Sequence, residues 1–260
     1  MRLIKYLHLI SLDVVVGAIL YQLFGSHFIC HTIPPNSHIL GLFFAIWLIY
    51  LVDRRIDLKK NIPQDERHFF QYQHQKFINA IILILIVLSI INLFFLPFYL
   101  IKIGVAILIG VGFYWFIWWR GLFKYVLGSK EFFTAFFYTL GISASILSKT
   151  GINGDFCLFF VLLYLCVFQN LVLFSSLEDE KTKNWNFILI GIELIFLSII
   201  GWVFFENAEI RTIALIIPFV ITFCLQVWIH YFAYSIQQRW VGELAFFSPI
   251  IYFIYEFFSK

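Results

Sequence analysis

The chain is divided into apolar segments that are each about long enough to cross a lipid bilayer. A membrane-spanning helix needs about 20 mostly apolar residues, within a range of about 17–25. Nine segments meet this requirement: 5–24, 37–52, 77–96, 99–119, 131–148, 155–174, 186–205, 210–231 and 241–258. Hydrophobic residues make up 62% of the 260 residues and charged residues 13%, a balance that a soluble fold could not bury. We therefore predict an all-α polytopic membrane protein with nine transmembrane helices in a single domain, residues 1–260.

Two prolines predict where helices are interrupted. The apolar block 77–119 is too long for one crossing, and Pro97, Lys102 and Gly104 predict a tight turn that divides it. Pro249 predicts a kink in the ninth segment.

The basic residues predict the orientation in the membrane. With nine crossings, one side holds 14 of the 18 Lys and Arg residues, and the other side holds Lys102, Lys149, Arg211 and Lys260. The positive-inside rule then predicts a cytoplasmic N-terminus and an outer C-terminus. Compact loops and low Met and Pro usage are typical of a bacterial chain, so we expect the bacterial inner membrane. We expect membrane lipid as a partner and no nucleic acid.

Two acidic clusters follow the second and sixth predicted helices, on the predicted cytoplasmic side. The first contains Asp53 and Asp57, and the second contains Glu178, Asp179 and Glu180. If the second helix continues past Val52, Asp53 and Asp57 share one helix face. Paired carboxylates of this kind hold Mg²⁺ together with a phosphate group of a substrate. The alternative is a solvated flank in which the aspartates pair with neighbouring Arg and Lys side chains.

Two acids fall inside predicted spans. A carboxylate in a membrane is costly, so Asp13 and Glu193 are either functional or hydrogen-bonded in helix packing. Gln169 and Asn170 have the same two interpretations, as groups that line a cavity or as interhelical hydrogen-bond partners.

Nine spans with acidic motifs after the second and sixth resemble the UbiA superfamily of intramembrane prenyltransferases. The first motif of that family is N-D-x-x-D-x-x-x-D; the chain keeps Asp53, Arg54 and Asp57 and has Ile49 and Tyr50 in place of the leading Asn-Asp. The second motif of the family is often D-x-E-G-D, and residues 176–180 are similar to it. Glu178 matches the central acid, Glu180 stands in place of the last Asp, and a serine stands in place of the first Asp. Tyr114, Lys124 and Lys130 are similar in position to the polar and basic residues that contact the diphosphate in that family.

The resemblance implies a bundle around a central, lipid-accessible cavity and transfer of a prenyl group from an isoprenyl diphosphate to a lipophilic acceptor. It implies a Mg²⁺ site formed by Asp53, Asp57, Glu178, Asp179 and Glu180. It also implies diphosphate binding by Arg54, Tyr114, Lys124 and Lys130. The alternative is a catalytically inactive UbiA-like protein that binds lipid or acts as a scaffold, because each motif lacks acids that the family pattern has.

Overall fold

The computed structural model describes residues 8–60, 66–120, 128–178, 185–206, 210–232 and 239–259. Within these ranges the chain is helical and contains no strand. The helices are α2 (Leu12–Cys30), α3 (Asn36–Lys60), α4 (Glu66–Gln73), α5 (Gln75–Leu93), α6 (Phe98–Trp119), α7 (Ser129–Thr150), α8 (Gly154–Glu178), α9 (Trp185–Glu206), α10 (Ile210–Phe232), α11 (Arg239–Leu244), the 3-10 turn η2 (Ala245–Phe247) and α12 (Pro249–Ser259).

Eight helices in the described part of the chain are long and apolar enough to cross a membrane. The eighth of these is the run Val241–Phe258, which combines α11, η2 and α12. The segment α6 corresponds to the fourth predicted crossing and has a shorter apolar stretch, Phe98–Tyr114. The prediction of an all-helical chain is therefore confirmed for the described residues, which include eight helices that could cross a membrane. The ninth crossing stays a prediction.

The turn in the long apolar block lies at Pro97, and the prediction that Lys102 and Gly104 belong to it is wrong. Helix α5 ends at Leu93 and α6 begins at Phe98, so Lys102 and Gly104 lie inside α6. The Lys102 ammonium lies 4.7 Å from the centre of the Phe98 ring, one turn earlier in the helix. A lysine near a helix end can place its charge over an aromatic ring in this way without ending the helix.

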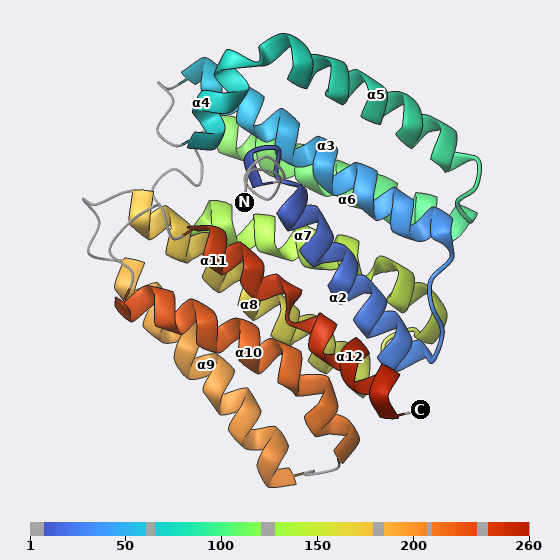
Figure 1. The fold of residues 1–260 in the computed structure, drawn as a ribbon, viewed down its shortest axis with the longest axis vertical. Helices are drawn as coiled ribbons and strands as arrows, with labels where there is room; N and C mark the ends of the chain where they lie inside the picture. The colour runs from blue at the N-terminus through green and yellow to red at the C-terminus, as the bar shows by residue number, and fades with distance from the viewer. Residues whose placement is uncertain are drawn as a thin grey trace.

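Helices α2 and α8 form the centre of the bundle. Helix α2 packs against α3, α7, α11, η2 and α12, and α8 packs against α7, α9 and α10. Figure 1 shows α5 on one outer side of the bundle, beyond α3, and α9 on the opposite outer side. The core contains aromatic side chains with no more than 1% exposure, among them Phe24, Phe159 and Phe219, whose rings contact one another.

The predicted break at Pro249 is present, and a neighbouring helix compensates for it. Proline has no N–H, so Pro249 cannot donate the helical hydrogen bond to the carbonyl of Ala245. The chain forms η2 at this point, and the Thr222 hydroxyl of α10 donates to the Ala245 carbonyl at 2.9 Å. The Ser248 hydroxyl donates to the Pro218 carbonyl at 2.8 Å, and Tyr21 from α2 lies 2.8 Å from Thr222 Oγ1. A broken helix is tolerated in a membrane where other helices supply the missing hydrogen bonds.

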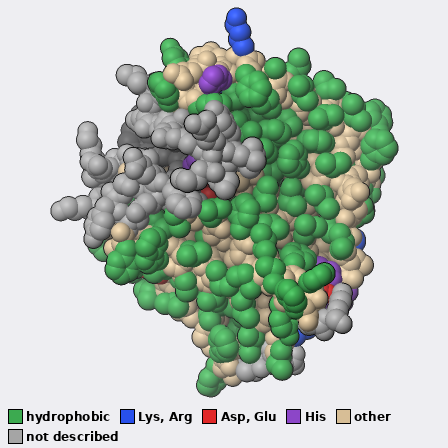
Figure 2. Space-filling view, in the orientation of Figure 1, with side chains coloured by type: hydrophobic (Ala, Val, Ile, Leu, Met, Phe, Trp, Pro, Cys, Tyr) green, Lys and Arg blue, Asp and Glu red, His purple; other side chains and the backbone are tan. Residues whose placement is uncertain are grey.

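The surface is apolar over most of the face that Figure 2 shows, with few charged side chains among the hydrophobic ones. Exposed aliphatic and aromatic side chains are frequent on α5, α6 and α9, including Leu83, Leu108 and Leu197. Such surfaces are compatible with contact to acyl chains, as expected for an integral membrane protein.

Candidate functional site

The candidate site is a pocket of about 760 Å³ bordered by α2, α3, α5, α6, α7, α8, α11 and η2. Its wall is mostly apolar, with side chains such as Leu42, Ile46, Leu96, Leu108, Phe137 and Leu171. Large, mainly apolar pockets with a few converging polar groups are typical small-molecule sites.

The polar groups of the pocket gather where α3 ends and α7 begins. Helix α3 contributes Asp53 and Arg54, and α7 contributes Lys130 and Glu131. A Cβ on Gly141 of α7 would lie 3.9 Å from Leu42 of α3. Asp53 lies as many residues after Leu42 in α3 as Lys130 lies before Gly141 in α7. Asp53 and Lys130 are therefore at the same level of the bundle.

Helix α8 joins this polar end through Ser175. The Ser175 hydroxyl donates to Glu131 Oε1 at 2.7 Å, and both residues line the pocket. Because Ser175 lies in the last turn of α8, the ends of α3 and α8 border one pocket. The shared metal site of the acids after the second and sixth spans stays a prediction.

Four predicted site residues border the pocket: Asp53, Arg54, Tyr114 and Lys130. The Arg54 side chain is buried with 5% exposure, Asp53 is half-buried, and Lys130 is exposed. A buried arginine is retained in proteins where acids or ligands bind its guanidinium group. The structure thus brings a carboxylate, a guanidinium and an ammonium group to one place.

The remaining predicted site residues fall where side chains are not described. Helix α3 continues to Lys60, so the backbones of Asp53 and Asp57 share a helix one turn apart, as predicted. Glu178 is the last residue of α8. The side chains of Asp57 and Glu178, and the whole of Lys124, Asp179 and Glu180, lie outside the described residues.

Asn170 lines the pocket, which is the first of the two interpretations given for it, cavity lining or interhelical hydrogen bonding. In the described part of the chain, Asn170 Oδ1 has no hydrogen-bond partner and is buried, as is Oε1 of Gln22. Buried polar atoms without a protein partner are places where a ligand or water binds. Gln169 is fully buried and does not border the pocket.

The donor set at this end fits Mg²⁺. The ion prefers oxygen ligands, from one or two carboxylates and from substrate phosphates. Asp53, Glu131, Asn170 Oδ1 and Ser175 all offer oxygen atoms at the pocket. The chemistry of these residues therefore suits a magnesium–phosphate ligand.

The two intramembrane acids have different outcomes. Asp13 lies beside the pocket, next to Val14 in its wall, and bonds to His8 at 2.6 Å. Glu193 of α9 bonds to two residues of α10 away from the pocket, at 2.9 Å to His230 and 3.1 Å from the Tyr231 hydroxyl. Glu193 therefore joins two helices, which is the packing interpretation.

Sequence reasoning missed two acids at the pocket, Glu131 and Glu243. Each occurs singly, and neither belongs to an acidic cluster. The position of Glu131 directly after Lys130, at the start of a predicted helix, was the only sequence signal for it. The position of Glu243 near the start of the ninth span gave a similar signal.

Comparisons with family models, curated proteins and solved structures find no match to this chain. We therefore base the proposed function on the pocket and its residues.

Proposed function

We propose that the protein transfers a prenyl group from an isoprenyl diphosphate to a lipophilic acceptor, with Mg²⁺ at the polar end of the pocket. The observation that supports this proposal is the meeting of α3, α7 and α8 at one pocket, where Asp53, Arg54, Lys130, Glu131 and Ser175 face a long apolar wall. A ligand with an anionic head and an apolar tail matches this distribution of side chains.

The head group would bind at the charged end. Arg54 and Lys130 donate charge-assisted hydrogen bonds to diphosphate oxygens, and Tyr114 adds a hydroxyl. In this proposal Lys124 joins them, and Asp53, Asp57, Glu178, Asp179 and Glu180 hold the metal. When bound, Mg²⁺ supplies positive charge to the diphosphate leaving group.

The apolar tail would lie along α3. Residues of α3 line the pocket from His38 to Arg54, a length of about 24 Å at 1.5 Å per residue. In this proposal the space along this path is the central, lipid-accessible cavity. Tyr50 and Tyr138 face it and place aromatic rings where an allylic cation is stabilised after the diphosphate leaves.

The proposed orientation has the polar end in the cytoplasm of a bacterium. The supporting observation is the distribution of basic residues, which places the N-terminus, the end of α3 and the start of α7 on the Lys- and Arg-rich side. The diphosphate would then be supplied from the cytoplasm.

Binding of farnesyl diphosphate to the purified full-length protein tests the proposal, because it needs no knowledge of the acceptor. Calorimetry with Mg²⁺ should show binding that EDTA weakens at least tenfold. Asp53→Asn should abolish this metal dependence. Mg²⁺-dependent release of pyrophosphate, in which water replaces the acceptor and farnesol and a proton form, should be lost with it. The control is Asp155→Asn, because Asp155 is half exposed, pairs with Arg211 at 3.4 Å and does not border the pocket.

Two results would overturn the enzymatic function. One is metal-dependent binding and pyrophosphate release that are unchanged in Asp53→Asn. The other is binding of the lipid diphosphate with no metal dependence in the unmodified protein, which is the behaviour of a lipid-binding protein without catalysis.

A further inference from the structure

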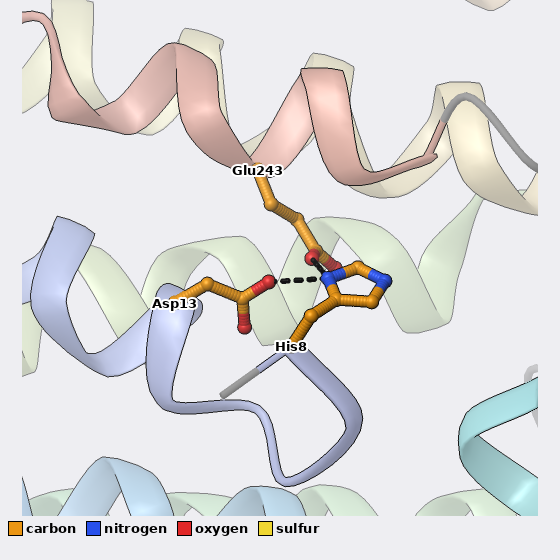
Figure 3. A group of neighbouring side chains, drawn as sticks. All are labelled: His8, Asp13 and Glu243. Atoms are coloured by element: carbon orange, nitrogen blue, oxygen red, sulfur yellow. Dashed lines mark hydrogen bonds and ion pairs between the residues drawn. The ribbon is translucent and has the colours of Figure 1, made fainter. Parts of the chain in front are cut away.

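Three side chains from distant parts of the sequence meet beside the pocket. His8 precedes α2, Asp13 lies in the first turn of α2, and Glu243 lies in α11. The His8 Nδ1 atom lies 2.6 Å from Asp13 Oδ2 and 3.2 Å from Glu243 Oε2 (Figure 3). Glu243 also borders the pocket, so the cluster adjoins its wall.

A close approach between α2 and η2 positions the two acids. A Cβ on Gly17 would lie 2.8 Å from the Cβ of Phe246, so only glycine permits this separation. Asp13 lies about one turn before Gly17, and Glu243 lies about one turn before Phe246. The contact therefore places the two carboxylates at neighbouring levels of the bundle.

The turn before α2 brings His8 to the same point. Ser11 has φ of 63°, a left-handed conformation that is uncommon for a residue other than glycine, and its N–H donates to the His8 carbonyl at 3.1 Å. Asp13 Oδ1 accepts a hydrogen bond from Val14 N at 3.0 Å, which leaves Oδ2 directed at His8. A carboxylate anchored through one oxygen presents the other with little conformational freedom.

Three side chains that can each serve as a metal ligand converge in the cluster. Two carboxylate oxygens approach one imidazole nitrogen, yet this nitrogen carries at most one proton. One ligand atom from each residue lies within 4.8 Å of the others. The Glu243 side chain is buried, with 5% exposure, and the Asp13 side chain is partly buried, with 11% exposure. A divalent cation between the three atoms would balance both carboxylate charges while the imidazole stays neutral.

A second observation is a buried hydroxyl in the same turn. The Ser11 hydroxyl belongs to the turn that links His8 to Asp13, is fully buried, and has no hydrogen-bond partner among the described residues. A water molecule bound to a metal is a group that could satisfy such a hydroxyl.

We propose that His8, Asp13 and Glu243 bind a divalent transition-metal ion of the zinc type at the wall of the pocket. One nitrogen and two carboxylate oxygens are a ligand set that Zn²⁺ accepts, with a fourth position left for water or a substrate oxygen. An imidazole ligand favours zinc-type ions over Mg²⁺. The site shares no residue with the proposed diphosphate site and does not depend on the prenyl-transfer proposal.

Zinc binding to the purified full-length protein, free of affinity tags, tests the inference. After treatment with EDTA and dialysis against Zn²⁺ in the presence of millimolar Mg²⁺, elemental analysis should find one zinc per chain. His8→Ala and Glu243→Gln should each weaken zinc binding at least tenfold. Cobalt should give visible absorption bands with the unmodified protein, and these bands should be lost in Glu243→Gln.

A matched control separates this site from other histidines. His27 also pairs with a carboxylate, at 3.3 Å from Glu256 Oε2, but it lies in the last turn of α2, and His27→Ala should leave zinc binding unchanged. Glu243→Gln keeps the size of the side chain, and an unchanged melting temperature without metal would show that it folds.

Three outcomes would overturn the zinc site: no zinc bound above background, equal zinc binding in the folded Glu243→Gln variant, or a loss of zinc in His27→Ala as large as in His8→Ala. Failure of this proposal is distinguishable from failure of the proposed function. Asp53→Asn should keep its zinc, and His8→Ala, at a residue that does not border the pocket, should keep Mg²⁺-dependent binding of farnesyl diphosphate.

Discussion

The contact between Gly17 and Phe246 gives a prediction whose magnitude follows from one distance. In Gly17→Ala the new methyl group would lie 2.8 Å from the Phe246 Cβ, an atom fixed to the backbone. Carbon atoms pack at about 3.5–4.0 Å, so α2 and η2 would have to separate by about 1 Å. Overpacking of this kind costs about 1–3 kcal/mol in free energy of unfolding.

Replacing glycine with alanine also stabilises a helix by about 0.5–1 kcal/mol, and this gain must be removed from the comparison. Gly191 in α9 provides the control, because a Cβ there would have no neighbour within 4 Å. Gly191→Ala should therefore show the gain alone. The difference between the two variants isolates the overpacking cost of about 1–3 kcal/mol.

Thermal unfolding in detergent, followed by the fluorescence of the eight tryptophans, measures this difference. At about 2–4 °C per kcal/mol, Gly17→Ala should melt about 2–12 °C below Gly191→Ala. Since the same contact positions Glu243 near Asp13, Gly17→Ala should also bind zinc more weakly. Equal melting temperatures in the two variants would refute the close packing of α2 on η2.

Two further predictions concern the core. Thr222→Val should cost about 1–3 kcal/mol, because it removes the hydroxyl that donates to the Ala245 carbonyl. Tyr21→Phe removes a hydroxyl that does not bond to Ala245 and should cost less, about 0.5–1 kcal/mol. A melting temperature of Thr222→Val equal to or above that of Tyr21→Phe would contradict this compensation of the helix break. Phe159→Ala, at a fully buried ring, should cost about 3–5 kcal/mol in free energy of unfolding. Phe187→Ala, at a 77% exposed ring, should change the melting temperature little. A similar decrease in melting temperature in both variants would contradict the assignment of the core.

The positions of the helices were largely predictable, because a bilayer requires a certain length of apolar chain. The predicted span 155–174 lies inside α8, and 210–231 matches α10 closely. The first span was predicted too early, at 5–24, whereas α2 covers Leu12–Cys30. The turn at Ile10 and Ser11 lies within a mostly apolar stretch, and hydropathy does not detect so short a turn there.

Part of the candidate site was also predictable, since charges at the ends of apolar helices are easily recognised. Asp53, Arg54, Tyr114 and Lys130 border the pocket as expected. Glu131 was missed because its role depends on a contact with Ser175, which is 44 residues away in the chain.

The sequence by itself determined that the chain forms apolar helices and that its charges gather near their ends, because both follow from the length and composition of local segments. Only the tertiary structure decided which faces of those helices meet. In lipid the helices are apolar on all sides, so hydrophobic periodicity does not mark an inner face. Small residues and interhelical hydrogen bonds make that choice, as Gly17 does against Phe246. The meeting of His8 and Asp13 with Glu243 is the result, and it brings together opposite ends of the chain.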